Sequence, residues 1–126
     1  MLDWSEDEEA VVKAMTRFHV HSGMCAALAR ALKPLALTRF GDARGIRLSP
    51  EEGALYLVPQ DSTRLPHWRA HLYLESQRHA VDAVTGPRGH SADSYRADHW
   101  RYAESLVVCE VDPEEVDVGI QQEDAS

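Results

Sequence analysis

The sequence predicts an α+β domain in which N-terminal helices pack on an antiparallel β-sheet. Over the first 34 residues, apolar side chains recur every three or four residues, which is the period of an amphipathic helix. After residue 34 the pattern changes to an alternation of apolar and polar residues, interrupted by turn-forming glycine, proline and aspartate. Helices followed by a series of strands are typical of the α+β class.

The first helix is expected over residues 6–19. Ser5 and Glu8 have the spacing of a capping box, and acidic residues crowd the first turn, where the helix dipole favours negative charge. The Ser-Gly pair at 22–23 interrupts this helix, and a second, mostly apolar helix follows it. Because proline lacks the N–H group that a helix interior requires, we expect Pro34 to end the second helix.

The remaining chain is expected to form five strands and one further helix. The predicted strands span residues 35–40, 54–59, 68–75, 78–84 and 105–111. Turns or loops are predicted at 41–45, 60–66 and 86–89. The predicted helix lies between residues 91 and 103, and its aromatic residues are expected to pack rather than to bind a ligand. These residues are Tyr95, Trp100 and Tyr102.

The length of 126 residues suits one domain with one core, expected over residues 1–112. The segment 113–126 is acidic and poor in bulky residues, so we expect a disordered tail. No apolar run reaches the length of a membrane span, and the acidic N-terminus is unlike that of a signal peptide. We therefore expect no membrane contact and a cytoplasmic protein, unless a dedicated secretion system delivers it to a target cell.

The formal net charge of −8 is concentrated at the two ends of the chain. Twelve of the 21 acidic residues lie within residues 1–9 and 110–126, which contain neither lysine nor arginine. Residues 10–109 hold the other nine acids and all 13 lysines and arginines, a net charge of about +4. The acidic ends argue against general nucleic-acid binding, whereas the basic middle favours an acidic substrate or partner.

The chain has two cysteines, too few for a disulfide framework in a domain of this size. Two thiols fit a reducing compartment, in which at least one of them is free for a function other than a disulfide bond. Cys109 lies in an apolar run and is expected in the core. Cys25 lies at the predicted start of the second helix, where unpaired N–H groups and the helix dipole would stabilise a thiolate.

The start of this helix could also bind the oxyanion of an attacked carbonyl group. If Ser22 is the N-cap, Cys25 is the third helical residue and its backbone N–H is one donor. A side chain shortly upstream would supply the second donor. His19, His21 and Ser22 remain alternatives for this role.

His71 and Asp82 lie on two neighbouring predicted strands. If residues 76–77 close a hairpin, Glu75 faces Arg78 and His71 falls directly opposite Asp82. Opposed residues have Cβ atoms about 5 Å apart on one face, so the carboxylate can orient the imidazole and stabilise the imidazolium. A register shift of one residue would place the two on opposite faces. The sequence thus predicts a triad of thiol, imidazole and carboxylate.

Each member of this triad also has an ordinary structural interpretation. Alone, Cys25 could be a small packing residue and His71 a structural or surface histidine. Asp82 could be a solvated charge or a partner of Arg78. A zinc site formed by Cys25 and the His-Val-His segment at 19–21 is disfavoured, because these side chains do not converge and no HExxH or paired-cysteine motif supports it. We therefore expect no metal and no cofactor.

Three segments resemble the papain-fold toxin domains of bacterial polymorphic toxin systems, which are similar to the wider group of papain-like thiol hydrolases. They are residues 22–29 (SGMCAALA), 71–74 (HLYL) and 80–86 (AVDAVTG). The resemblance covers roughly residues 20–86 and implies a papain-like fold. It also implies that Cys25 is the nucleophile, that His71 is the general base and acid, and that Asp82 orients His71.

The expected function is therefore that of a papain-like thiol hydrolase acting on an amide or thioester of a protein or peptide-like substrate. Deamidase, peptidase and acyl-transferase reactions all fit, and the resemblance adds the role of a bacterial toxin or effector. The alternative is a non-catalytic interaction or immunity module on the same scaffold, which would bind a partner protein.

Overall fold

The computed structural model describes residues 2–18, 25–54, 57–60, 70–82 and 85–115. Its α-helices are α1 (Glu6–Phe18), α2 (Cys25–Phe40) and α3 (Ala92–His99), and none of these described helices is long and apolar enough to cross a membrane. The strands are β1 (Arg44–Ser49), β2 (His71–Ser76), β3 (His79–Val81), β4 (His90–Ser91) and β5 (Val107–Val111). Short 3-10 turns, η1 (Ala103–Ser105) and η2 (Pro113–Glu115), flank β5. The predicted α+β class, with helices packed on an antiparallel sheet, is confirmed.

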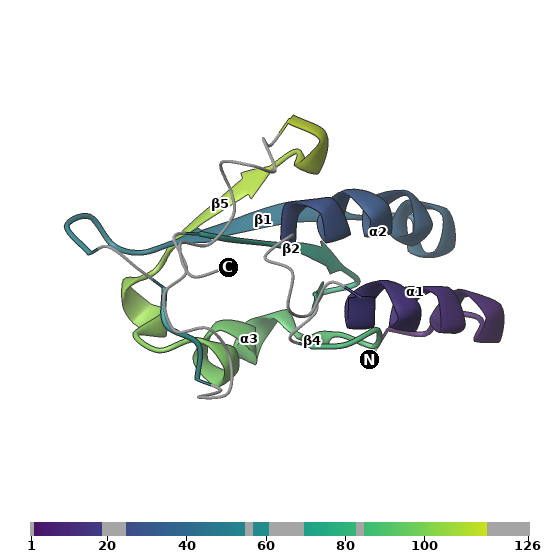
Figure 1. Ribbon diagram of the computed structural model, residues 1–126, viewed down its shortest axis with the longest axis horizontal. Helices are drawn as coiled ribbons and strands as arrows, with labels where there is room; N and C mark the ends of the chain where they lie inside the picture. Colours follow the sequence, from purple (N-terminus) through teal and green to yellow (C-terminus); the bar gives the residue numbers. More distant parts are fainter. Residues whose placement is uncertain (1, 19–24, 55–56, 61–69, 83–84, 116–126) are drawn as a thin grey trace.

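The strands form one antiparallel sheet in the order β4-β3-β2-β1-β5. β2 lies at the centre of this sheet, and alternate residues of a strand point to opposite faces. Leu72 and Leu74 pack against residues of α2, whereas Tyr73 packs against Tyr95 of α3. Helices therefore cover both faces, with α2 and α3 on opposite sides of β2 (Figure 1).

The two faces carry separate apolar cores. The core on the α2 face consists of Leu2, Trp4, Val12, Leu28, Leu32, Ala36, Leu74 and Val81. The core on the α3 face consists of Ile46, Leu48, Leu57, Tyr73, Ala80, Tyr95 and Trp100. A third, smaller group contains Cys25, Ala29 and Leu72. Cys25 therefore belongs to the contact between the first turn of α2 and the start of β2.

The start of the first helix agrees with its prediction. The N–H of Glu8 donates to Ser5 Oγ at 3.2 Å, and the N–H of Ser5 donates to Glu8 Oε1 at 3.0 Å, which is a reciprocal capping box. The helix is described as far as Phe18. The predicted break at 22–23 lies outside the described residues.

The predicted end of the second helix at Pro34 is wrong, and so is the strand predicted over residues 35–40. α2 continues through Pro34 and includes all of these residues. A proline costs a helix interior about 3 kcal/mol, since it lacks a donor and crowds the preceding turn. However, Leu28, Leu32 and Ala36 recur every four residues and are at most 2% exposed. Burial of each large apolar side chain contributes about 1.5–3 kcal/mol, so the packing of α2 on the sheet outweighs the proline.

β1 overlaps the end of the predicted turn and continues over residues 46–49, for which the sequence predicted no element. The turn was expected over residues 41–45, but the strand begins at Arg44. Gly41 accommodates the end of α2 with a φ of +84°, and its N–H donates to the carbonyl of Leu37 at 3.0 Å. β1 was missed because it holds only two large apolar residues, Ile46 and Leu48, between polar ones.

Three further predictions need correction at their boundaries. In the strand predicted over 54–59, Pro59 makes only an isolated bridge with Trp100, and residues 55–56 lie outside the described residues. The third helix is shorter than predicted because it ends at His99. Residues 113–115, assigned to the tail, form η2, whose Pro113 carbonyl accepts a hydrogen bond from Arg30 Nε at 2.6 Å. The rest of the predicted tail lies outside the described residues.

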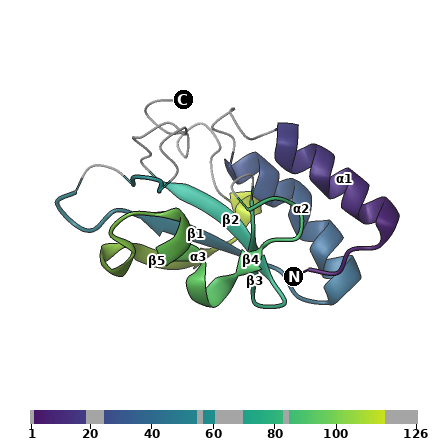
Figure 2. The same cartoon turned by 90° about the horizontal axis from the view of Figure 1, so that it is seen from below.

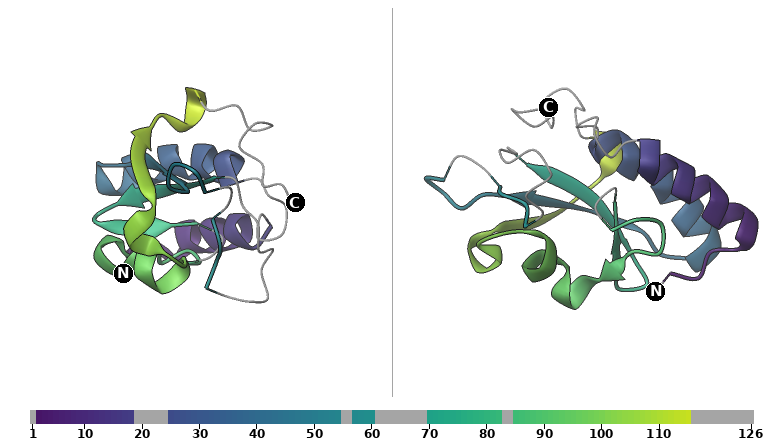
Figure 3. Two further views of the ribbon diagram at one scale, coloured as in Figure 1. Left: turned by 90° about the vertical axis from the view of Figure 1, so that its left-hand side faces the viewer. Right: turned by 60° about the horizontal axis from the view of Figure 1, so that its bottom comes forward.

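β5 forms one edge of the sheet (Figure 3). Most of its residues are exposed. The prediction that Cys109 lies in the core is therefore wrong, because β5 is flanked by a strand on one side alone. Tyr102, which was expected to pack, is 74% exposed. The other two aromatic residues of that prediction, Tyr95 and Trp100, are buried.

The N-terminal segment lies against the loop that follows β3 (Figure 2). The N–H of Leu2 donates to the carbonyl of Arg88 at 2.9 Å, and Trp4 Nε1 donates to the carbonyl of Pro87 at 2.7 Å. The ring of Trp4 packs on Phe40 with centroids 4.8 Å apart. These contacts connect the loop after β3 to the C-terminal end of α2.

Candidate active site

The β2–β3 hairpin places His71 and Asp82 on the same face, although its register differs from the prediction. The turn consists of residues 77–78, both with positive φ (50° and 60°), so Ser76 pairs with His79. Asp82 therefore lies two positions away from the residue opposite His71, instead of directly opposite. Because side chains alternate with a period of two, a shift of two residues keeps both on one face.

His71 and Asp82 form a direct hydrogen bond in a buried environment. His71 Nε2 and Asp82 Oδ2 are 2.6 Å apart, and both residues are 2% exposed. The imidazole centroid lies 5.0 Å from the ring of Trp100 and 6.0 Å from that of Tyr73. These rings exclude water from the pair, which strengthens the electrostatic part of the hydrogen bond.

The turn that ends β3 holds the Asp82 carboxylate. The N–H of Thr85 donates to Asp82 Oδ1 at 2.8 Å, and the N–H of Asp82 donates to Thr85 Oγ1 at 3.0 Å. Gly86, with a φ of +81°, closes the turn by donating its N–H to the carbonyl of Asp82 at 3.0 Å. Aspartate and threonine favour such turns because their short side chains bond to the nearby backbone. One carboxylate oxygen is thus fixed locally, while the other meets His71.

Two aromatic residues at α3 extend this network. Tyr95 Oη donates to Asp82 Oδ2, and Trp100 Nε1 donates to Tyr95 Oη at 3.2 Å. Both aromatic residues are at most 1% exposed. Burial and the charge of Asp82 raise the pKa of Tyr95 well above its usual value, so the hydroxyl remains a proton donor. A chain of hydrogen bonds therefore runs from the Trp100 indole through the Tyr95 hydroxyl to the Asp82 carboxylate.

The electrostatics of the pair favour an imidazolium beside a carboxylate. Burial lowers the pKa of His71, but the hydrogen bonds and charges of Asp82 and Cys25 outweigh burial and raise it to about 10. Burial raises the pKa of Asp82, but its bonds to His71, the charge of His71, and the bonds from Tyr95 and Thr85 lower it to about 2. Both groups are therefore charged across the neutral range.

The Cys25 sulfur lies beside β2, past the last described pair of the β2–β3 ladder. In a two-residue hairpin the closing pair exchanges both hydrogen bonds, so the N–H groups of Ser76, Leu74 and Leu72 all point toward β3. The last pair of the described ladder is Leu74–Val81, and Leu72 lies beyond it. The N–H of Leu72 donates instead to Cys25 Sγ at 3.4 Å.

The thiol and the imidazole lie at the same end of β2, on opposite faces of the sheet. Cys25 comes from the α2 face, whereas the His71 side chain points to the α3 face, as Tyr73 does. A hydrogen bond with the Cys25 side chain contributes to the raised pKa of His71. Asp82 holds the Nε2 atom of the same ring. The structure thus joins His71 to Asp82 by a direct hydrogen bond, and Cys25 acts electrostatically on the same imidazole.

Sequence reasoning missed the residues that hold the triad in place. Thr85 had a usable signal, because an aspartate followed three residues later by threonine and then by glycine is a turn pattern. Tyr95 and Trp100 had none, since their contact with Asp82 depends on how α3 docks on the sheet. The three candidates for the second oxyanion donor lie outside the described residues.

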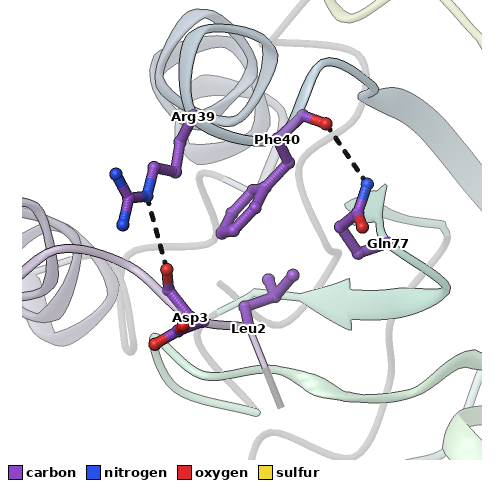
Figure 4. Close-up of a pocket in the computed structure, with 5 residues that line it drawn as sticks. All are labelled: Leu2, Asp3, Arg39, Phe40 and Gln77. Carbon is purple, nitrogen blue, oxygen red and sulfur yellow. Dashed lines mark hydrogen bonds between the residues drawn. The ribbon is translucent and has the colours of Figure 1, made fainter.

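The described residues contain no group of three or more His, Cys, Asp or Glu side chains that could hold a metal ion, and the segment 19–21 lies outside them. One cavity of about 350 Å³ lies at the far end of α2 from Cys25 (Figure 4). It is lined by Leu2, Asp3, Arg39, Phe40 and Gln77. A second cavity, of about 510 Å³, lies between α1 and the loop after Asp82. Neither of these two cavities is lined by a triad residue.

The candidate nucleophile comes from α2, whereas the candidate base and the carboxylate that orients it come from one hairpin, β2 and the turn after β3. No family model, curated protein or solved structure matches this chain. The functional argument therefore rests on the geometry of the site itself.

Replacing Tyr95 with phenylalanine should lower the free energy of unfolding by about 1–3 kcal/mol, because it leaves a buried carboxylate oxygen and the buried indole N–H of Trp100 with one partner fewer. Urea denaturation at pH 7, followed by circular dichroism, measures this loss. Tyr102→Phe is the matched control, since the exposed Tyr102 hydroxyl can bond to water. Equal stability of the two variants would contradict a role for Tyr95 in holding Asp82.

Proposed function

We propose that this chain is a papain-like thiol hydrolase that acts on an amide of a protein or peptide substrate through Cys25, His71 and Asp82. The observation that carries the proposal is the buried hydrogen bond between Asp82 and His71, beside which Cys25 contributes to the raised pKa of the same imidazole. A thiol needs an adjacent base, and the base needs a third group that orients it, before nucleophilic attack is efficient.

The proposed reaction has two steps that use the same imidazole. The Cys25 thiolate attacks the carbonyl carbon and forms a C–S bond, and the His71 imidazolium gives its proton to the leaving nitrogen as the C–N bond breaks. Water then attacks the thioester while His71 accepts a proton from that water. The C–S bond breaks, the carboxylic acid leaves, and the thiolate and imidazolium are restored.

The leaving group and the acceptor define the reaction subtype. Ammonia leaves in a deamidation, an amine leaves in peptide cleavage, and an amine replaces water as the acceptor in acyl transfer. The resemblance of residues 22–29, 71–74 and 80–86 to toxin domains extends the proposal to a bacterial toxin or effector that modifies a protein amide in a target cell.

A non-catalytic interaction module is the second candidate, and the burial of Cys25 is the observation that favours it. Cys25 is only 8% exposed and packs with Ala29 and Leu72. A buried cysteine among small apolar residues often serves packing alone. Such a module would bind its partner with or without a reactive thiol.

Iodoacetamide at pH 6 separates the two candidates within one molecule, because the chain carries an exposed cysteine as an internal reference. If the imidazolium of His71 stabilises a thiolate, Cys25 should be alkylated at least about tenfold faster than Cys109 despite its burial. Mass spectrometry of the tryptic peptides 18–30 and 102–126 measures the two rates separately. Faster alkylation of Cys109, with Cys25 unreactive, would favour the interaction module.

A further inference from the structure

Arg47 lies on the α2 face of the sheet, beside the strand residue that contacts the thiol. Its neighbours in β1, Ile46 and Leu48, belong to the core on the α3 face, so Arg47 points to the other face. It pairs with Leu72 on β2. The Leu72 side chain packs with Cys25, and the Leu72 N–H donates to Cys25 Sγ at 3.4 Å.

The strand register places Arg47 beside the residue whose N–H contacts the nucleophile. Opposed residues of an antiparallel pair have Cβ atoms about 5 Å apart on the same face, so Arg47 stands one strand away from Leu72 and the Cys25 sulfur. Arg47 lies at the same end of the β1–β2 pair as His71, which is paired with the adjacent Leu48. The arginine and the triad are thus at one end of the sheet.

Arg47 has no counter-ion in the described part of the chain. It is half-buried, and its Nε is buried without a hydrogen-bond partner. Other described arginines differ, since Arg44 pairs with Glu75 and Glu110, and Arg88 pairs with Glu9. A buried donor atom without a partner is costly, and an anionic ligand that binds beside β2 would supply a partner for this half-buried side chain.

We propose that Arg47 binds a carboxylate of the substrate next to the scissile amide. The substrate class is then an amide that carries a carboxylate close to its carbonyl carbon, such as a peptide bond beside aspartate or glutamate. The planar guanidinium matches a carboxylate with two parallel hydrogen bonds, which a lysine does not reproduce. The net charge of about +4 over residues 10–109 agrees with an acidic substrate. This inference rests on the proposed function of Cys25.

The test compares two alkylating probes that differ only in charge. In both reactions the Cys25 sulfur forms a bond to the methylene carbon and iodide leaves, but iodoacetate carries a carboxylate where iodoacetamide carries an amide. Arg47→Met should lower the rate of Cys25 alkylation by iodoacetate about tenfold and change the iodoacetamide rate by less than about twofold. Arg47→Lys should lie between the wild type and Arg47→Met for iodoacetate.

Arg78→Met is the control, because it removes the same charge from an exposed side chain in the hairpin turn. It should leave both rates unchanged. An unchanged iodoacetamide rate also shows that the Arg47 variants are folded. The inference is overturned if iodoacetate alkylates Cys25 as fast in Arg47→Met as in the wild type, or if Arg78→Met slows this reaction equally. The proposed function stands in either case. If iodoacetamide itself fails to label Cys25, the proposed function fails and the inference falls with it.

Discussion

Replacing Asp82 with asparagine should lower the free energy of unfolding at pH 6 by about 3–5 kcal/mol, which is the effect of leaving one member of a buried ion pair without its partner. The asparagine keeps the shape of the side chain but removes the charge that faces the imidazolium of His71. In the wild type, one carboxylate oxygen of Asp82 accepts hydrogen bonds from both His71 Nε2 and Tyr95 Oη. In the variant, an uncharged amide group takes the place of this carboxylate. Urea denaturation of both proteins gives the difference directly.

The pH dependence of the stability difference between the wild type and Asp82→Asn identifies the His71–Asp82 pair as its source. The pKa of His71 rises from 6.5 to about 10 on folding, so its contribution is complete below pH 6.5 and is lost as the pH rises through about 10. The pKa of Asp82 falls from 3.8 to about 2, so its contribution is present above pH 3.8 and is lost as the pH falls through about 2. The stability difference should therefore be largest between about pH 4 and 6.5.

Asp93→Asn is the control for this measurement, because Asp93 is an exposed residue whose nearest basic group is 3.9 Å away. Because Asp93 lies in the first turn of α3, its replacement should cost at most about 1 kcal/mol, well below the effect of Asp82→Asn. A stability difference for Asp82→Asn that is constant from pH 3 to pH 9 would mean that the carboxylate acts through packing alone.

Replacing His71 with glutamine should slow the alkylation of Cys25 by iodoacetamide about 100-fold at pH 6. An ordinary thiol with a pKa near 8.5 is about 0.3% ionised at this pH, and the thiolate is the reacting form. Without the imidazolium, the rate should rise about tenfold with each pH unit between 6 and 8, as it does for an isolated thiol. Mass spectrometry of the peptide 18–30 over a pH series measures both effects.

His79→Gln provides the matched control, since His79 lies in the same hairpin and bonds to the backbone of the turn at Gln77. Its Cys25 alkylation rate should equal that of the wild type. Equal rates in His71→Gln and the wild type at pH 6 would show that the imidazole does not activate the thiol. In that case the buried pair would have a structural role.

The sequence predicts most elements whose signal is local. The capping box of Ser5 and Glu8 needs only the first turn of α1, and it is present in the fold. Residues 35–40 show why other elements escape prediction. Their alternation suits a strand and Pro34 suits a helix end, but Leu32 and Ala36 are buried against the sheet, and this tertiary contact decides for the helix.

The candidate site also contains some features that have a local sequence signal and others that depend on tertiary packing. The pairing of His71 with Asp82 could be predicted because both residues lie within one hairpin, where the face of each side chain follows from its position. The predicted register differs by two residues from the register in the structure. The reason is that residues 77–78 form the turn, with positive φ angles that their identities do not suggest. The roles of Tyr95 and Trp100 could not be predicted, since no local pattern indicates where α3 packs.

The placement of Cys25 and His71 on opposite faces of the sheet has a consequence for the cooperativity of folding. The thiol packs in the small group of Cys25, Ala29 and Leu72, whereas the imidazole packs beside Trp100 on the α3 face, so the two stay close only while both sides of the sheet are formed. Local opening of either half would separate them without global unfolding. In hydrogen exchange, the amide of Leu72 at this junction should therefore report the weaker of the two halves, whichever opens first.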